Sequence, residues 1–449
     1  MTSEQWKRWM RVARQTVRVV AVMAAAGAAT AIAHAQATDT EPAAAEAQSQ
    51  SDELWVRTAQ SRDRKLRMEV ACRLYERPGG GPKVMLAGAV HVGDKPFYKK
   101  LQDILDANDV VLYEGVSPPG SERSVPASEA QRKELTNARL RLLATMAHQV
   151  ETDGAQVTSL DALRAGLAGH TRALGWLDAA QRDAWGNQIQ VFAQDDGTID
   201  VRSAGPNGHF EPTRTDSDDM YFSDQQALSP EELGETPGIQ QKLAKSLGLV
   251  FQLDEMDSDH AHWRNVDMSA AELEQRFAAA GLTEEGDGLF AMLEGTGLPA
   301  KLMGLVLGII EHFPGAQPRA KMMLMDMLTH ADDLMELAGV PGMEDLMRVI
   351  IEDRNKVVID ELARLVDMPD APETIGIVYG AGHMPDLEQR MFERLGYKRT
   401  KERWLPAIEI DLEREGITRL ERAMMKRQLE MQLEMMRKQA QLQRPSDPV

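Results

Sequence analysis

The sequence predicts an α/β protein. Apolar, β-branched runs at residues 84–90, 109–113 and 375–379 are typical of strands that are buried on both faces. Residues 95–107 lie between the first two runs and carry apolar side chains at helical spacing. The order strand, helix, strand predicts a parallel βαβ unit. With 449 residues, 43% of them hydrophobic, the chain can also bury a large core.

The N-terminus is typical of an export signal. Five basic residues between Lys7 and Arg18 precede an apolar stretch at 19–32, and small residues follow up to Ala35. The stretch is shorter than the roughly 20 residues that cross a bilayer. We therefore predict a cleaved signal peptide at 1–35, a flexible leader at 36–52, and a periplasmic or secreted protein. The alternative is a membrane anchor formed by an uncleaved signal.

Charge and cysteine content exclude several classes of partner and site. Removal of residues 1–35 takes away five basic residues and one acidic residue, so the formal charge changes from −19 to −23. This negative charge argues against nucleic acid and anionic lipid as partners, because both need basic patches. The single cysteine, Cys72, excludes an intramolecular disulfide and a cysteine-based zinc cluster. Its apolar neighbours indicate a small core residue, with a catalytic thiol as the alternative.

The first half of the chain gives further elements in order. Strand-like runs at 65–74 and 83–90 flank a Pro- and Gly-rich turn at 78–82, which predicts a hairpin. A helix is expected at 127–150. Residues 188–203 predict a second hairpin around Asp195-Asp196-Gly197, which we interpret as a turn rather than a calcium loop. The segment 204–236 is rich in Asp, Ser, Pro and Gly, so it is expected to be a functional or disordered loop.

The second half is mostly helical before the sheet returns. Residues 237–366 are Met-rich and helical, including an apolar run at 302–310 that predicts a buried helix. After the strand at 375–379, we expect a helix at 385–395 and a last strand at 397–404. Thr418 to Glu421 forms a capping box that starts a long C-terminal helix. One face of that helix carries Leu420, Met424, Met431 and Met435, for which self-packing and homodimerisation are both open.

Two strands end in the same motif. Gly88-x-x-His91 is followed by Pro96, and Gly380-x-x-His383 is followed by Pro385, each in a helical pattern. Each histidine therefore leaves the carboxyl end of a strand, where ligands of open α/β sheets bind. We expect the two histidines to meet in one site.

Glu114 could complete that site. It directly follows an apolar strand, where a buried carboxylate needs a cation, a metal or a proton. Two imidazoles and a carboxylate are a common ligand set for a catalytic divalent ion, which activates water and polarises a carbonyl. This chemistry suits the hydrolysis of amide or ester bonds, with Glu114 as a metal ligand or as the general base. The alternative is that both histidines are hydrogen-bonded core residues and that Glu114 pairs with an arginine.

These residues resemble the TraB/GumN/Tiki family. The resemblance rests on both Gly-x-x-His motifs, on Phe97-Tyr98, on Asp109 to Gly115, and on Arg354-Asn355, in the same order over most of 66–400. It implies a metal-dependent protease-like enzyme with His91, Glu114 and His383 at its centre and Arg354 and Asn355 in support. It also implies a mixed central sheet with flanking helices, similar to erythromycin-esterase and ChaN-like proteins. Without the resemblance, the sequence predicts that Arg354 forms an ordinary salt bridge with Glu352 or Asp353 on the surface of a helix.

The expected domains and function follow from these patterns. A TraB/GumN-like domain is expected at 53–410, with a mostly helical insertion at about 165–345, and an amphipathic helix and tail at 411–449. We expect a hydrolase of peptide or ester bonds that uses Mn, Co or Zn and acts on a peptide or small-molecule substrate. The rivals are a non-catalytic protein that sequesters a peptide or haem, and an inactive scaffold that uses its C-terminal helix.

Two further groups could bind metal. Asp257, Asp259, His260 and His262 are close in sequence and could form a second metal position. Asp326, His330 and Asp333 fall on one helical face, which is more typical of a solvated surface.

Overall fold

The computed structural model describes residues 54–60, 64–122, 125–194, 198–211, 217–224, 228, 239–282, 315–329 and 343–443. The expected signal peptide, leader, Asp195 turn and apolar run at 302–310 lie outside these residues. The chain forms two compact units. The first contains Met1–Val111, Pro237–Asp257 and Ala280–Val449, and the second contains Leu112–Thr236 and Ser258–Ala279.

The first unit is built on a mixed sheet, which confirms the α/β class. Its strands lie in the order β1, β2, β3, β11, β5, and β12 pairs with the other side of β2. β3 and β11 are parallel, whereas β2 is antiparallel to β1, β3 and β12. The bounds are Val56–Gln60 for β1, Lys65–Glu76 for β2, Lys83–Ala89 for β3, Val110–Tyr113 for β5, Thr374–Gly380 for β11 and Lys398–Asp411 for β12.

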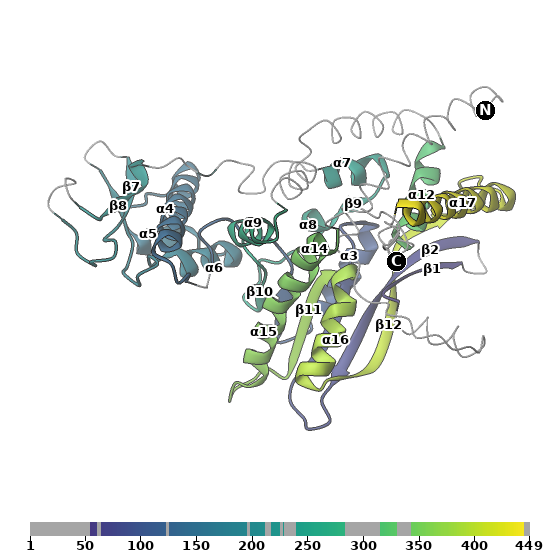
Figure 1. Cartoon of the computed structure of the whole chain (residues 1–449), viewed down its shortest axis with the longest axis horizontal. Coiled ribbons are helices and arrows are strands. Elements are labelled where there is room, and N and C mark those ends of the chain that lie inside the picture. The colour runs from purple at the N-terminus through teal and green to yellow at the C-terminus, as the bar shows by residue number, and fades with distance from the viewer. Residues whose placement is uncertain are drawn as a thin grey trace, which may run out of the picture. The chain divides into compact units, whose positions relative to one another are not determined.

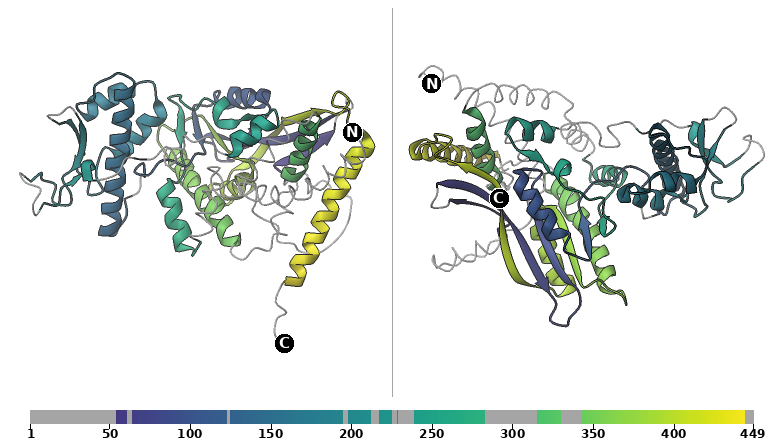
Figure 2. Two further views of the ribbon diagram at one scale, coloured as in Figure 1. Left: turned by 90° about the horizontal axis from the view of Figure 1, so that it is seen from above. Right: turned by 180° about the vertical axis from the view of Figure 1, so that it is seen from behind.

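Helices cover both faces of this sheet. Figures 1 and 2 show α15 (Arg354–Val366) and α16 (Met384–Leu395) on one face and α3 (Lys95–Leu105) on the other. Both α3 and α16 have a proline in the first turn, where its missing N–H costs no hydrogen bond. This double cover explains why every residue of β5 is buried, and it confirms the strand–helix pattern read from the sequence.

Further elements complete the first unit. β4 (Val92–Gly93) pairs with β9 (Val250–Phe251). The α-helices are α7 (Ile239–Ser246), α8 (Gln252–Glu255), α12 (Ala316–Thr329), α14 (Met343–Met347) and α17 (Arg419–Gln443), with a π-helix η2 at Arg348–Asp353 and a 3₁₀ turn η3 at Ala381–His383. The predicted cap of α17 is confirmed, because the Glu421 N–H donates to Thr418 Oγ1 at 3.1 Å. In the described part of the chain, no helix is both long and apolar enough to cross a membrane.

The second unit has its own core. Helices α4 (Glu129–Thr152), α5 (Leu160–Gly166) and α6 (Thr171–Ala180) pack with a small sheet of β6 (Gln190–Ala193), β7 (Ile199–Ser203) and β8 (Met220–Tyr221), followed by a 3₁₀ turn η1 (Phe222–Asp224). The predicted hairpin at 188–203 is confirmed as the β6–β7 pair. Leu140, Leu143, Val191 and Val201 lie in the core. The division between the two units falls within β5, and the second unit also contains β10 (Trp263–Asn265) and α9 (Ala270–Ala279).

Cys72 is a core residue. Its side chain is buried on β2, and desolvation raises the pKa of the thiol to about 12. A thiol with this pKa stays protonated at neutral pH and is a poor nucleophile. The interpretation as a small apolar residue is therefore supported, and the catalytic alternative is not.

Glu122 is a buried carboxyl group in the second unit. Only 7% of the residue is exposed, and its Oε1 accepts a hydrogen bond from the Ser269 hydroxyl at 2.7 Å. Within the described residues, Oε2 is buried without a hydrogen-bond partner. Burial is the main cause that raises the pKa of Glu122 above its ordinary value, and Glu272 adds to it. The folded state therefore favours the neutral acid.

We expect Glu122→Gln to stabilise the second unit at pH 7. Because the folded-state pKa is raised, the stability of the wild type falls as the pH rises through the ordinary glutamate range and levels off above the folded-state pKa. The variant should lack this loss and gain on the order of 1 kcal/mol at pH 7. Urea unfolding of the wild type and the variant between pH 4 and 8 measures this gain, and hydrogen exchange of α4 and α9 assigns it to the second unit. A gain that is equal at both ends of the range would contradict the titration.

Candidate functional site

The two Gly-x-x-His motifs leave neighbouring parallel strands. β3 and β11 pair along their whole length, with Gly88 opposite Tyr379 and Ala89 opposite Gly380. His91 follows the end of β3 by two residues, and His383 follows the end of β11 by three. The expectation that each histidine leaves the carboxyl end of a strand is therefore confirmed, and both motifs start from the same edge of one sheet.

Gly88 brings the two motifs into contact. A Cβ on this residue would lie 3.6 Å from Ala381 Cα, inside the second motif, and only 2.7 Å from Val70 Cγ1 on β2. The second distance is shorter than a Cβ contact allows, so only glycine fits here without a shift of the Val70 side chain. The glycine of the first motif therefore allows β3 to pack closely against the turn that carries His383.

The chain around His91 is anchored from two sides. The Tyr98 hydroxyl of α3 donates to the Val90 carbonyl oxygen at 2.7 Å, and burial raises the pKa of Tyr98, which keeps the phenol protonated as a donor. The carbonyl oxygen of His91 accepts from the Gln252 N–H at 2.8 Å, next to the β4–β9 pair. His91 itself is half-buried. These contacts fix the backbone of the turn that carries His91.

His383 is held by Asn355. Both side chains are fully buried, and His383 Nδ1 lies 2.7 Å from Asn355 Oδ1. The Asn355 amide nitrogen donates to the His383 carbonyl oxygen at 3.0 Å and to Asp386 Oδ2 at 2.8 Å. Asn355 comes from the first turn of α15, and Asp386 from the first turn of α16. One amide thus ties together the two helices that start beside the site.

These contacts determine the tautomer of His383. The Asn355 amide nitrogen faces two oxygen acceptors, so the opposite amide orientation would place its carbonyl oxygen against both of them. Oδ1 therefore faces the ring and accepts the hydrogen bond from Nδ1–H. In a neutral imidazole with the proton on Nδ1, Nε2 carries the lone pair. With its proton on Nδ1, a neutral imidazole can bind a metal or accept a proton only through Nε2.

The supporting contacts extend beyond the predicted residues. Asp386 also accepts a hydrogen bond from Arg390 Nε at 2.6 Å, one turn further along α16. Sequence reasoning missed both residues, and the only signal was an acidic side chain three positions after His383. Arg354 is 6% exposed, so it does not occupy the helix-surface position that is its alternative reading. It follows the π-helix η2, a distortion that is frequent at functional sites.

Glu114 belongs to the second unit. It directly follows β5 and is half-buried, and the next residue is fixed by two hydrogen bonds. The Gly115 N–H donates to Asp267 Oδ2 at 2.9 Å, and its carbonyl oxygen accepts from Asn265 Nδ2 at 2.8 Å. The predicted ligand set of His91, His383 and Glu114 therefore spans both units, and only the two histidines share one. The role of Glu114 stays a prediction.

Among the described residues, Asp257, Asp259, His260 and His262 do not form one cluster of metal-binding atoms, and the second predicted metal group is described only in part. Asp257 belongs to the first unit, whereas Asp259, His260 and His262 belong to the second. Asp259 accepts from the Arg172 N–H at 3.1 Å and lies 3.5 Å from His170 Nδ1. The rings of His260 and His262 lie side by side with centroids 5.7 Å apart. Of the second group, Asp326 lies on α12, and His330 and Asp333 lie outside the described residues.

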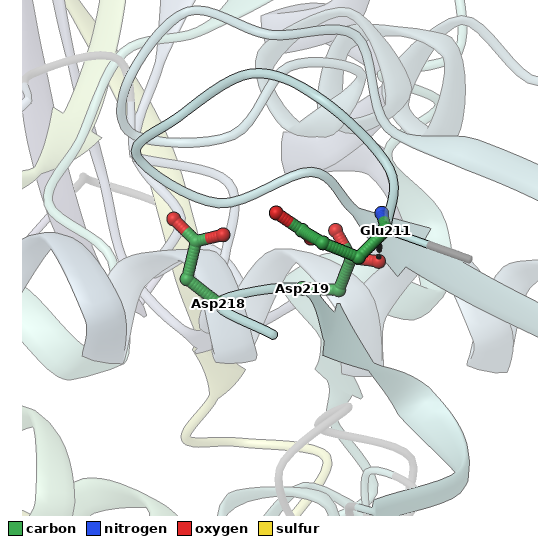
Figure 3. A group of neighbouring side chains, drawn as sticks. All are labelled: Glu211, Asp218 and Asp219. Atoms are coloured by element: carbon green, nitrogen blue, oxygen red, sulfur yellow. Dashed lines mark hydrogen bonds between the residues drawn. The ribbon is translucent and has the colours of Figure 1, made fainter. Parts of the chain in front are cut away.

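An acidic group between β7 and β8 was not predicted as a site. Figure 3 shows Glu211, Asp218 and Asp219 of the second unit near one another. One carboxylate oxygen from each residue lies within 4.8 Å of those of the other two. A hydrogen bond from Asn207 lowers the pKa of Glu211, and burial raises the pKa of Asp219. Backbone and side-chain donors already satisfy these oxygens in part, including the Asn207 N–H to Asp218. Exposed acidic groups of this kind are common without an ion.

Comparison with known proteins gives no match: no family model, curated protein or solved structure matches this chain.

Proposed function

We propose that the protein is an exported, divalent-metal-dependent hydrolase of peptide or ester bonds, related to the TraB/GumN/Tiki family. The observation that carries the proposal is the parallel pairing of β3 and β11, because it starts both Gly-x-x-His motifs at one edge of one sheet. The tautomer of His383 gives independent support, since a neutral imidazole with its proton on Nδ1 is a form that binds metal through Nε2. Export through residues 1–35 to the periplasm or the exterior is part of the same proposal.

The donor set fits a borderline or hard divalent ion such as Mn, Co or Zn. His91 and His383 would supply imidazole nitrogens, and a carboxylate, for which Glu114 is the prediction, would complete the set. When bound, the ion would lower the pKa of water and polarise the substrate carbonyl. Asn355 holds the His383 ring in place and keeps its proton on Nδ1. Arg354 would orient a substrate carboxylate or carbonyl, and Glu114 would accept the proton if it acts as the base.

Metal binding tests the histidines directly. The purified protein should bind Mn, Co or Zn at a fixed ratio of metal to protein. His91→Ala and His383→Ala should each lower the metal affinity by more than about tenfold. His148→Ala is the matched control, because His148 is exposed on α4 in the other unit. Equal metal binding by all four proteins would show that the metal binds elsewhere, for example at Glu211, Asp218 and Asp219.

Turnover separates the enzyme from its rivals. The metal-loaded protein is screened against a peptide library and a set of esters, with Glu114→Gln as the control that keeps the shape of the side chain. Cleavage that is lost in His383→Ala supports the hydrolase, and equal cleavage by every variant points to a contaminant. A Soret band after addition of haem, without turnover, would favour the sequestering protein.

A further inference from the structure

The C-terminal helix α17 presents an exposed apolar stripe, which we define as Leu420, Met424, Met431 and Met435. Their exposed fractions are 70%, 50%, 51% and 58%. At 3.6 residues per turn these four positions lie within about 60° of one another around the helix axis. Figure 2 shows α17 as one straight helix whose far end extends away from the sheet of its own unit. Four large apolar side chains on one face are therefore left in water.

The flank next to the stripe is the side that binds α17 to its own unit. Arg319 Nε of α12 lies 2.6 Å from Glu421 Oε1, and both side chains are more than three-quarters buried. Met425 and Gln428 are half-buried on the same flank, and Ile417 just before the helix is buried. These contacts fix the rotation of α17 about its axis. The stripe therefore keeps its outward direction and is not covered by the described part of its own unit.

The spacing of the stripe is symmetric. The intervals between its members are four, seven and four residues, so the pattern reads the same in both directions. A second α17 that runs antiparallel, with a two-fold axis between Arg427 and Gln428, places Leu420 opposite Met435 and Met424 opposite Met431. This is the property that a two-fold interface between identical chains requires, because the same patch must complement itself.

The charges of α17 favour the same arrangement. Within the stretch 420–435, the half before the axis has a net charge of +2 from Glu421, Arg422, Lys426 and Arg427, and the half after it has a net charge of −2 from Glu430 and Glu434. Arg419, Arg437 and Lys438 lie outside this stretch. Antiparallel pairing places the basic half of one helix beside the acidic stretch of the other, whereas parallel pairing places like charges together. Lys426 and Glu430 are exposed and lie 3.8 Å apart within one helix, so both can also reach a partner at the rim.

We propose that the apolar stripe of α17 is a homodimer interface, which binds the same stripe of a second copy in antiparallel orientation. The paired stretch from Leu420 to Met435 is about 22 Å long. The methionines suit this role, since their flexible side chains pack well against one another. The proposal does not depend on the metal site.

Sedimentation of the full chain over a range of concentrations tests the dimer. The wild type should sediment as a dimer, and Met431→Glu should sediment as a monomer at the same concentrations. Arg419→Gln changes the net charge by the same amount at an exposed position away from the stripe, and it should stay dimeric. A wild type that is monomeric throughout, or a Met431→Glu variant that stays dimeric, overturns the proposal. Because both positions are exposed, folding is not expected to change, and thermal unfolding checks this.

Cysteine cross-linking tests the orientation. A mixture of Met424→Cys and Met431→Cys chains should form a mixed disulfide, because these positions face each other in the antiparallel register. Met424→Cys alone should not cross-link, since the two copies of this position are about 10 Å apart, beyond the reach of a disulfide. Efficient cross-linking of Met424→Cys with itself would indicate a parallel pair and would overturn the antiparallel register. Cys72 is buried and does not interfere.

Discussion

Arg73→Met is expected to lower the free energy of unfolding of the first unit by about 3 kcal/mol. Arg73 is fully buried on β2 and binds two carboxylates, with Nε 2.8 Å from Glu402 Oε2 and Nη1 2.7 Å from Glu388 Oε2. Its Nη2 donates to the Leu54 carbonyl oxygen at 2.7 Å, and its guanidinium lies 4.2 Å from the Trp55 ring. Removal of the cation would take the arginine partner from Glu388 and leave Glu402 with the longer ion pair to Arg399 at 3.5 Å. Removal of one member is the costly way to break a buried ion pair.

The loss should be local to the sheet. Glu402 lies opposite Arg73 on β12, and Glu388 lies on α16, so one arginine joins β2, β12 and the helix that follows His383. Hydrogen exchange of peptides from these elements, together with urea unfolding, measures the effect. Arg364→Met is the matched control, because Arg364 is 54% exposed in its pair with Glu361 and should change stability by less than about 0.5 kcal/mol.

A charge-conserving variant tests why arginine is needed. Arg73→Lys keeps the positive charge but has one ammonium group, which cannot reach two carboxylates and a carbonyl in three directions. We expect the free energy of unfolding of Arg73→Lys to lie between that of the wild type and that of Arg73→Met. If Arg73→Met and Arg364→Met destabilise the protein equally, the buried ion pairs do not hold β12 and α16 to β2.

The strands with continuous apolar runs were predictable from the sequence. β3, β5 and β11 are buried on both faces, so nearly every residue is apolar and the pattern is unambiguous. β12 extends well beyond the expected end at residue 404. The prediction stopped too early because two register shifts, one of them next to Pro406, break the alternation on which a strand prediction depends. β10 has three residues and lies in a segment dominated by helical patterns, so it could not be recognised.

The candidate site was predictable only in part. The repeated motif identified His91 and His383, and the parallel pairing of strands almost 300 residues apart agrees with it. The contact between Asn355 and Asp386 is tertiary, because the two residues lie on different helices and no spacing rule connects them. The π-helix η2 was also not predicted, since π-helical turns are rare and its buried residues Val349, Ile350 and Ile351 are consecutive, which does not distinguish one helix type from another. Local patterns therefore predicted the candidate ligands and missed most of what orients them.

Asn355→Leu is expected to have the second large effect, on both stability and the candidate site. The change removes three buried hydrogen bonds and leaves the His383 Nδ1–H, the His383 carbonyl oxygen and Asp386 without this partner. Each unsatisfied buried group costs about 1–3 kcal/mol, although Arg390 still binds Asp386, so we expect a total loss of about 3 kcal/mol. Metal affinity should fall by about 10–100-fold, because the residue that orients a histidine ligand is lost. Urea unfolding and metal titration measure the two effects.

The tautomer of His383 distinguishes orientation from simple loss of packing. In the wild type, nitrogen NMR should show the proton of the neutral ring on Nδ1, whereas in Asn355→Leu the ring should populate the other tautomer. Asn355→Asp provides the second variant, because its carboxylate still accepts from Nδ1 but can no longer donate to Asp386. It should keep the wild-type tautomer and lose stability, since two carboxylates would then lie together. A wild-type ring that carries its proton on Nε2, or a tautomer that is unchanged in Asn355→Leu, would show that Asn355 supports the fold without directing the chemistry of His383.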